Sequence, residues 1–344
     1  MQKNILVTGA GGYIGTSLID QLLEEGNRVT GVDRYFFGAE LLGETKNHSN
    51  FKFLKKDIRD LTVEDFEGID VVCDLAALSN DPCGDLDEKT TYSINHRGRV
   101  NVAALSKKAG VRQHIFASSC SVYGAGANIA LTEESEINPV SIYAKANVLA
   151  ENDVCDLADN KFTVTVLRQA TVFGLSKRMR FDLAINIMTL NAVKKGKIFV
   201  IGGGTQWRPF IHVKDTARAF IHLIDRDPSI INGQKFNVGN SEHNFNILSL
   251  AYVVRENIPF PIEIEVVPDD EDKRNYNVSF EKIKKVLGFE PKLTPGYGVK
   301  EIYEGLKQGF VDTDERTVTV AWYKHIISSK QLIDSLIIND RILD

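Results

Sequence analysis

The chain of 344 residues is long enough for one large or two modest domains with a well-buried core. Apolar residues make up 43% of it and charged residues 25%, as in ordinary globular proteins, and no stretch approaches the roughly 18 apolar residues of a membrane span. The formal net charge of −5 argues against a nucleic acid or an anionic membrane as a partner.

The first half of the chain alternates short β-branched runs with segments of helical periodicity. Runs that fit strands buried on both faces span residues 4–9, 28–33, 51–57, 70–77, 114–119 and 163–169. Helical segments lie between them at residues 16–26, 92–110 and 141–160. The alternation predicts an α/β fold with a doubly wound parallel sheet, whose ligand loops lie at the carboxyl ends of the strands.

The pattern changes after about residue 176. Helices are expected at residues 177–197 and 215–226, and a turn with flanking strands at 199–215. We therefore predict a first domain at residues 1–176 and a smaller α/β domain at 177–311, with strands from about 209–240 returning to the first sheet. The last segment, 312–344, contains an amphipathic helix candidate at 320–337 whose role the sequence leaves open.

The stretch VTGAGGYIG follows the first predicted strand and opens a predicted helix. Its residues Gly9, Gly12 and Gly15 allow a tight turn, close approach of the backbone to a pyrophosphate, and close packing of helix on strand. An acid, Asp33, ends the second predicted strand. Its carboxylate can bind both ribose hydroxyls and repels a 2′-phosphate, so NAD is predicted over NADP, although Arg34 could accept such a phosphate.

Further motifs in the same order resemble an extended short-chain dehydrogenase/reductase of the NAD-dependent epimerase/dehydratase family, which acts on nucleotide sugars and includes UDP-glucose 4-epimerase. They are KDIRD at 56–60, DLAAL at 74–78, SSCSVYG at 118–124, SIYAKAN at 141–147, LRQATVFG at 167–174, RPFIHVKD at 208–215 and DKRNYNVSFEKIKKVLGFEP at 272–291. The resemblance covers about residues 3–310. It implies a Rossmann-type doubly wound sheet with a smaller C-terminal α/β substrate-binding domain.

The resemblance also implies a cofactor site for NAD. Its predicted contacts are Gly9, Gly12, Tyr13, Ile14, Gly15, Asp33, Arg34, Asp57, Ile58, Leu75, Ala76, Ala77, Asn95, Tyr143 and Asn147.

The same resemblance places the catalytic residues at Ser119 and Tyr143, with Asn147 as a contact to the nicotinamide ribose. In the family, a lysine four residues after the tyrosine lies on the same helix face and favours the phenolate. Here that position is Asn147, and Lys145 points to another side of the helix. Because a free tyrosine has a pKa of about 10, the sequence predicts a handicapped base, activity that rises into the alkaline range, and a gain in turnover on Asn147→Lys.

The residues after Ser119 narrow the reaction class that the resemblance implies. Family 4,6-dehydratases have an Asp-Glu pair there, whereas this chain has Cys120 and Ser121. Elimination of water is therefore not expected, and Cys120 is expected to be a small buried hydrophobe. Oxidation or reduction at C4 of the sugar, with or without epimerisation, remains.

A nucleoside diphosphate requires fixed cations, for which the forked donors of arginine are suited. The resemblance places Arg208 and Arg274 at the diphosphate, and Thr171 stands where the family usually has Asn. In the loop that faces the sugar, Asp81 is an acid/base, a ligand of a sugar hydroxyl or a turn residue. The predicted substrate contacts are Ser79, Asp81, Ser119, Ser121, Thr171, Arg208, Arg274 and Tyr276.

Two functions remain open from the sequence. One is an NAD-dependent nucleotide-sugar epimerase or 4-dehydrogenase/ketoreductase, and the other is a catalytically reduced protein that binds NAD and a nucleotide sugar. The resemblance implies a homodimer that pairs through the helices carrying Asn95 and Tyr143. Scattered histidines and four cysteines without CxxC spacing predict no metal site and reduced thiols, and the absence of a leader before the first strand predicts a cytoplasmic protein.

Overall fold

The main sheet of the computed structural model, which describes residues 2–268 and 274–337, is seven-stranded and entirely parallel. Its strands lie in the order β11-β7-β5-β4-β1-β2-β3, so the order reverses between β1 and β4. The bounds are β1 (Asn4–Thr8), β2 (Arg28–Asp33), β3 (Phe51–Lys55), β4 (Val71–Asp74), β5 (Gln113–Ser119), β7 (Thr163–Gln169) and β11 (Gln234–Val238). The predicted Rossmann-type fold is confirmed.

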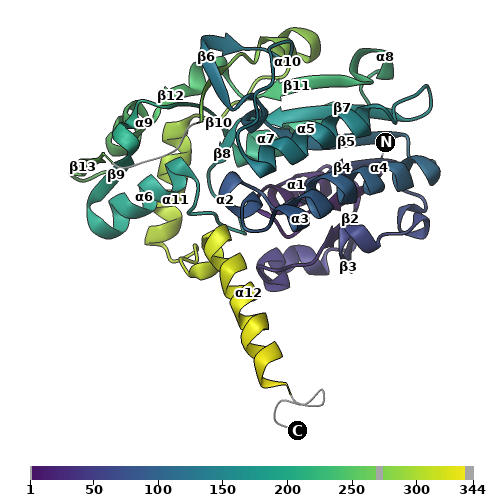
Figure 1. Ribbon diagram of the computed structural model, residues 1–344, viewed down its shortest axis with the longest axis horizontal. Coiled ribbons are helices and arrows are strands. Elements are labelled where there is room, and N and C mark those ends of the chain that lie inside the picture. Colours follow the sequence, from purple (N-terminus) through teal and green to yellow (C-terminus); the bar gives the residue numbers. More distant parts are fainter. Residues whose placement is uncertain (1, 269–273, 338–344) are drawn as a thin grey trace.

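Helices cover both faces of this sheet (Figure 1), which explains its continuous apolar strands. On one face α1 (Tyr13–Glu24) packs against α7 (Val213–Leu223). On the other, α4 (Arg99–Lys108) packs against α5 (Ile142–Cys155). The two faces have separate apolar clusters: Ile5 and Val7 of β1 belong to one, and Leu6 between them belongs to the other.

Short helical segments connect the strands. They are η1 (Ala39–Asn47), η2 (Ile58–Asp60), η3 (Val63–Phe66), α2 (Asp81–Gly84), α3 (Glu88–Thr91), η4 (Tyr92–Gly98), η5 (Cys120–Tyr123), α8 (Pro228–Ile231) and α10 (Glu281–Leu287). The helix expected at 92–110 is thus divided. Its first part, η4, is a π-helix, and only its second part, α4, is α-helical. Such π-segments are rare and are frequent at functional sites.

The smaller unit lies beside the carboxyl ends of the main strands, on the left in Figure 1. It contains a three-stranded sheet of β8 (Thr171–Phe173), β10 (Trp207–His212) and β12 (Asn244–Asn246), and the pairs β9 (Lys197–Ile201) with β13 (Glu263–Val267) and β6 (Ala125–Leu131) with β14 (Asn275–Val278). Two short segments, η6 (Gly202–Gly204) and η7 (Ser241–His243), adjoin them. Of the strands expected to return to the main sheet, β11 does so and β10 does not.

Three helices, α6 (Ala184–Lys195), α9 (Ile247–Glu256) and α11 (Pro295–Lys307), give the smaller unit its own core. Its centre includes Ile185, Leu250, Val254 and Val299, all fully buried. The helix expected at 177–197 begins only at Ala184. The residues before it form an irregular segment that contributes buried arginines to the site described below.

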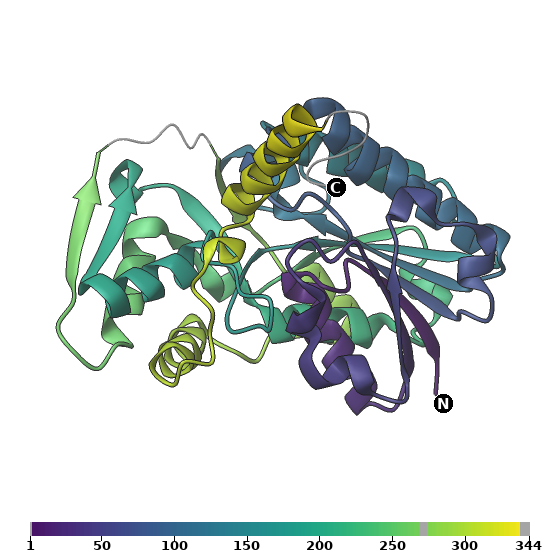
Figure 2. The same ribbon diagram turned by 90° about the horizontal axis from the view of Figure 1, so that it is seen from below.

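The C-terminal helix α12 (Thr319–Leu336) follows η8 (Glu315–Thr317) and projects from the junction of the two units. Figure 2 shows its first turns close to where the smaller unit meets the main sheet. Part of the predicted extension, 338–344, lies outside the described residues, as do residues 272 and 273 at the start of the last motif.

Candidate active site

Most of the predicted site residues line a single cavity at the carboxyl ends of β1, β2, β4, β5 and β7. They are Gly9, Gly12, Tyr13, Ile14, Gly15, Asp33, Arg34, Asp57, Ile58, Leu75, Ala76, Ala77, Ser79, Asp81, Ser119, Ser121, Tyr143, Thr171, Arg274 and Tyr276. The cavity therefore joins the glycine loop to the predicted sugar and diphosphate contacts, as the switch point between β1 and β4 requires.

The glycine loop fits a pyrophosphate because its backbone leaves no room for side chains. At Gly9 (φ +70°) a Cβ would lie 2.9 Å from the carbonyl carbon of Leu75, and at Gly15 it would lie 2.1 Å from the carbonyl oxygen of Gly9. No side chain among the described residues caps the first turn of α1, and that turn contains no acid. Its N–H groups and the positive end of the helix dipole are thus available to an anion.

Asp33 lies at the end of β2, where a ribose would follow the pyrophosphate. Its carboxylate accepts hydrogen bonds from the N–H groups of Tyr35 at 2.6 Å and Gly11 at 3.0 Å. Burial raises the pKa of Asp33, and these N–H donors oppose the rise. Arg34 Nη1 lies 3.2 Å from Asp57 Oδ2, so its charge is already shared with a carboxylate. This arrangement favours a cofactor without a 2′-phosphate.

Removing the Asp33 carboxylate should weaken NAD binding and relax the discrimination against NADP. We expect Asp33→Ala to weaken NAD by about 10-fold or more, since charged hydrogen bonds contribute about 1.5–3 kcal/mol. Asp33→Asn keeps the shape without the charge and should mainly improve NADP. Calorimetric titration with both dinucleotides measures this, and native protein that binds NADP at least as tightly as NAD contradicts it.

Tyr143 is fixed in the first turn of α5 by two contacts. Ser141, the N-cap, accepts a hydrogen bond from Ala144 N at 3.1 Å and donates one to Asp81. Gly84 of α2 packs directly on Tyr143, because a Cβ there would lie 2.8 Å from Tyr143 Cβ. The start of the helix and the sugar-facing loop therefore form one rigid part of the site.

Burial raises the pKa of Tyr143 above its ordinary value. The side chain of Asn147 opposes this rise, the Asp81 carboxylate adds to it, and the Arg99 guanidinium and the Ser119 hydroxyl also oppose it. Tyr143 is therefore protonated at neutral pH unless positive charge beside it makes the phenolate accessible.

Arginine and tyrosine side chains lie at the part of the cavity predicted to bind the substrate. Arg274 forms an ion pair with Asp81, and its carbonyl accepts a hydrogen bond from Arg208 Nη1 at 2.5 Å. The Arg208 guanidinium lies 5.1 Å from the ring centroid of Tyr276. Burial raises the pKa of Tyr276 to about 12, and the two arginines oppose the rise. Asp81 is thus more than a turn residue, since it joins α5 to the predicted diphosphate contact.

Three predicted contacts do not line the cavity, and packing explains each. Asn95 is fully buried and pairs with the backbone of Leu78, accepting from its N–H at 2.8 Å and donating to its carbonyl at 3.1 Å. Arg208 lies behind Tyr276. Asn147 is fully buried and accepts a hydrogen bond from Arg99 Nη1 at 3.4 Å. These residues support the cavity from behind.

Gln169 lines the cavity but is not predicted from the sequence, whereas Ser121 is a predicted substrate contact. At the end of β7 the buried amide of Gln169 has no hydrogen-bond partner for either of its atoms among the described residues, and within the same ranges Ser121 Oγ also has none. Both face the cavity beside Ser119, whose strand pairs with that of Gln169. The signal that the sequence carries for Gln169 is its position at a strand end. Such groups suit a polar ligand.

The C-terminal extension, whose role the sequence leaves open, contributes a residue of α12 to the lining of the cavity. Tyr323 of α12 lines the cavity and lies 5.9 Å and 5.5 Å, between ring centroids, from Phe36 and Phe37. Trp322 Nε1 donates to the carbonyl of Phe36 at 2.6 Å. Arg178 also lines the cavity, stacked 3.7 Å from the Phe37 ring, and burial lowers its pKa to about 10.

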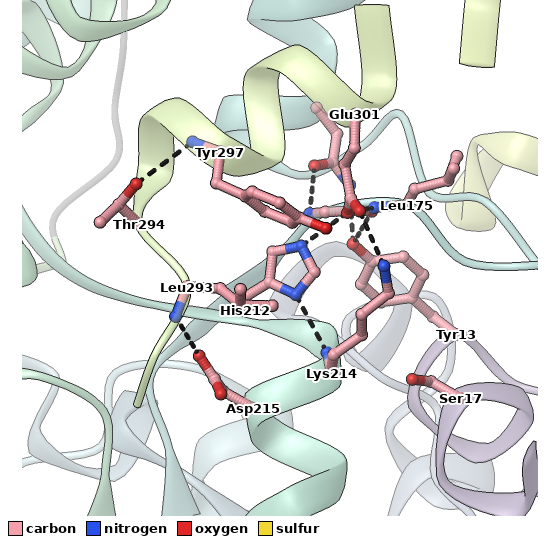
Figure 3. A network of polar contacts seen from close by, with 12 residues as sticks. Tyr13, Ser17, Leu175, His212, Lys214, Asp215, Leu293, Thr294, Tyr297 and Glu301 are labelled. Carbon is pink, nitrogen blue, oxygen red and sulfur yellow. Dashed lines mark hydrogen bonds and ion pairs between the residues drawn. The ribbon is translucent and has the colours of Figure 1, made fainter. Parts of the chain in front are cut away.

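The last residues of the motif RPFIHVKD belong to a polar network around Glu301, as Figure 3 shows. Glu301 of α11 lies 2.6 Å from His212 Nε2, 2.9 Å from Lys214 Nζ and 2.6 Å from Leu175 N. Burial opposes ionisation of Glu301, but the contact with His212 outweighs it and holds the pKa of the carboxyl below its usual range. Beside this network the Tyr13 hydroxyl donates to the carbonyl of Gly174 at 2.5 Å, which ties the glycine loop to the smaller unit.

Some site types find no support in the part of the chain that the structure describes. Residues 2–268 and 274–337 contain no group of three or more His, Cys, Asp or Glu side chains placed to hold a metal ion. Within the same ranges, no helix has the length and apolar character needed to cross a membrane.

The sheet order, the glycine loop and a partly buried tyrosine beside a serine define a dinucleotide-binding protein of the short-chain dehydrogenase/reductase type. The family described as the NAD dependent epimerase/dehydratase family matches residues 5–239, and the chain belongs to this family. Its members are NAD-dependent enzymes, among them epimerases and decarboxylases.

Individual relatives agree with this family. UDP-glucose 4-epimerase of Mycolicibacterium smegmatis is 29% identical over 87% of this chain and 97% of its own length. UDP-glucuronic acid decarboxylase 6 of Arabidopsis thaliana is 28% identical over 84% of each. Among solved structures, MoeE5 in complex with UDP-glucuronic acid and NAD is 25% identical, with a TM-score of 0.76 over 89% of this chain and 99% of that one.

Proposed function

We propose that the protein is an NAD-dependent nucleotide-sugar epimerase or 4-dehydrogenase/ketoreductase that acts by hydride transfer at C4 of the sugar. One observation carries the proposal: Tyr143 and Ser119 line the same cavity as the glycine loop and Asp33 at one end and Arg274 with Tyr276 at the other. A dinucleotide and a nucleotide sugar would therefore meet at the tyrosine. The similarity to a UDP-glucose 4-epimerase supports this substrate class.

In this proposal Tyr143 takes the proton from the sugar hydroxyl and later returns it. Ser119 donates a hydrogen bond to the reacting oxygen, which its place beside Tyr143 permits. NAD, when bound, accepts the hydride and can give it back. Gln169 and Ser121 are suited to hydroxyl or amide groups of the sugar, because their polar atoms face the cavity without partners among the described residues.

The residues after Ser119 favour redox chemistry without loss of water. Cys120 is buried off the cavity, where its Sγ lies 3.3 Å from the carbonyl of Arg168, and burial raises the pKa of its thiol. Ser121 lines the cavity but has no acid or base character near neutral pH. Neither residue supplies the acid–base pair that elimination across the sugar requires.

A panel of UDP-, GDP-, CDP- and dTDP-sugars tests the proposed function. The protein with NAD should convert at least one of them to its C4 epimer or 4-keto product, seen by product analysis and by transient absorbance of reduced nicotinamide. Tight binding of a nucleotide sugar and NAD without conversion of any member would instead identify a catalytically reduced binding protein. Release of water as the main reaction would contradict the exclusion of dehydratase chemistry.

We further propose that residues 1–176 bind the cofactor and 177–311 the sugar nucleotide, in a cytoplasmic protein with reduced thiols. The four cysteines are free.

We expect a homodimer that pairs through α4 and α5, since Leu149 of α5 leaves 43% of its surface exposed on a helix next to the site. Light scattering at micromolar concentration should give twice the chain mass, and Leu149→Asp should shift it toward the monomer. A native mass of one chain contradicts this arrangement.

A further inference from the structure

Arg99, the first residue of α4, is a fully buried cation next to the catalytic tyrosine's helix. Its Nε lies 3.1 Å from Asp74 Oδ2, and its Nη2 donates to the carbonyls of Asp74 and Ala117, each at 2.7 Å. The guanidinium stacks 3.6 Å from the ring centroid of Phe116. The remaining terminal nitrogen, Nη1, points to Asn147 Oδ1 at 3.4 Å. Its position is therefore fixed on every side.

The guanidinium lies where a long cationic side chain from position 147 would end. Residues four apart share a helix face, so position 147 lies beside Tyr143 on α5. Asn147 is too short to bring charge to this place and is itself neutral, but Arg99 Nη1 contacts the tip of its side chain. Arg99 also lines the cavity that Tyr143 lines. A positive charge is therefore present on this face of α5, although it comes from α4.

We propose that Arg99 supplies, from α4, the positive charge that favours the Tyr143 phenolate and that Asn147 does not provide. Arg99 acts through Tyr143 and Asn147 and not on the sugar, so it is a positioning residue. The inference rests on the proposed role of Tyr143 as the proton acceptor. It extends that proposal, because it names the group that makes this partly buried tyrosine usable as a base.

The charges around Tyr143 are few, and their signs are opposed. Asp81 of α2 disfavours the phenolate and Arg99 favours it. Asp81 is itself paired with Arg274, which reduces its effect. The other ionisable groups on elements packed against α5 are Cys83 of α2, Glu88 and Lys89 of α3, Tyr92, the exposed Arg97 and His96 of η4 (the last paired with Asp153), Lys107 and Lys108 of α4, His114 of β5, Cys120 and Tyr123 of η5, and Arg168 of β7 paired with Glu151.

The counter-ion of Arg99 lies on the far side of the guanidinium from Asn147. Asp74 contacts Nε and also accepts a hydrogen bond from Thr8 Oγ1 at 2.6 Å, so its charge is held toward β1. Behind it His114 is neutral, because burial lowers its pKa to about 4. The side of the ion pair that faces α5 is therefore its positive side.

This arrangement reverses the sequence-based expectation for Asn147→Lys. Position 147 is fully buried, and a lysine there would place an ammonium against the Arg99 guanidinium. Like charges in a buried site oppose each other strongly. We expect Asn147→Lys alone to reduce folding stability and to bring no gain in turnover. The double variant with Asn147→Lys and Arg99→Gln should recover native stability and native turnover, because only one of the two buried cations remains.

Two substitutions of opposite sign test the proposal. Arg99→Gln should move the alkaline-rising limb of the pH–rate profile up by about one unit or more, a roughly 10-fold loss of turnover near neutral pH. Asp74→Asn should move the limb down, because it removes the opposing charge and keeps an acceptor for Thr8 and Arg99. Arg99→Lys is the matched control and should stay near the native profile. NAD binding and circular dichroism report whether each variant is folded.

A second readout does not need turnover. Difference absorbance of tyrosinate between each variant and the same variant with Tyr143→Phe measures the ionisation of Tyr143 directly, and it should move in the same directions. If no sugar is converted but these titrations move as expected, the proposed function fails and the role of Arg99 stands. Equal profiles for Arg99→Gln and Arg99→Lys, or shifts of the same sign for Arg99→Gln and Asp74→Asn, overturn it. If Arg99→Gln does not fold, a pH–rate profile of Asp74→Asn that equals the native profile is by itself enough to overturn the proposal.

Discussion

Tyr143→Phe should lower turnover by roughly 10³-fold, the scale of a lost general acid–base group, while the cofactor still binds. The substitution removes only the hydroxyl. Gly84 and the Ser141 cap continue to hold the ring and the helix turn in place. The glycine loop and Asp33, which hold the dinucleotide in our proposal, lie at the other end of the cavity. Steady-state rates with the best sugar of the panel, and NAD binding by fluorescence, measure the two parts of this expectation.

Tyr123→Phe is the matched control for that experiment. Tyr123 is more deeply buried and lies on the neighbouring η5, but its hydroxyl bonds to Arg168 and Asn237 and does not line the cavity. We expect it to lose about 1 kcal/mol of stability and little turnover. If Tyr143→Phe retains native turnover, another group moves the proton, and Asp81 is the first candidate because it bonds to Ser141 beside the tyrosine.

The predicted residues that line the cavity are mostly those whose placement depends on local backbone. Gly9 and Gly15 are needed wherever a strand, a tight loop and a helix meet a pyrophosphate, so three glycines in that context suffice to place the loop. Asp33 ends a strand beside it, and parallel strands bring their ends to one edge. Ser119 and Tyr143 follow from motifs that lie on a strand end and on the next helix.

The residues that the sequence did not predict are those whose side-chain direction is set by tertiary packing. Arg99 lies in a segment whose helical periodicity would suggest a solvated cation, and charged side chains are seldom fully buried unless paired. The π-helical segment at Tyr92–Gly98 directly precedes Arg99 and has a different rotation per residue from an α-helix. A regular helical projection therefore does not give the direction of the Arg99 side chain. Tyr323 reaches the cavity across nearly the whole sequence, and no local pattern encodes that contact.

Asn147 illustrates both limits. Its type and spacing indicate that position 147 brings no charge of its own to Tyr143. The predicted weak base follows only if no cation reaches the tyrosine from another element. The Arg99 guanidinium contacts Asn147 from α4, and in our proposal it supplies that charge, but this contact exists only once the two helices are packed together.

Glu151→Ala should cost about 3–5 kcal/mol of folding stability, the largest stability change that we expect from a single substitution here. Glu151 and Arg168 are both essentially fully buried and form a fork, with Arg168 Nη2 at 2.8 Å from Oε2 and Nε at 3.0 Å from Oε1. Ser118 donates to the same carboxylate at 2.5 Å, and Lys235 Nζ lies 3.3 Å from it. The pair joins α5 to the ends of β5 and β7, just behind the active site.

The expected loss arises from the charge left behind. Burial alone would lower the pKa of Arg168, and its contacts with Glu151 outweigh that and raise the pKa instead. Without Glu151 the buried guanidinium remains charged and keeps the bond from its Nη1 to the Tyr123 hydroxyl, and Ser118 loses its acceptor. Urea titration followed by circular dichroism measures the change in unfolding free energy.

Asp153→Ala on the same helix is the control, because Asp153 is about half exposed and pairs with His96 at the surface. That substitution should change stability by less than about 1 kcal/mol. Glu151→Gln should fall between the two, since it keeps the acceptor for Ser118 and loses the charge. A Glu151→Ala variant as stable as the Asp153→Ala variant would mean that water or a rearranged acid compensates Arg168. In that case the position of α5, and with it the fixed place of Tyr143, would not depend on this ion pair.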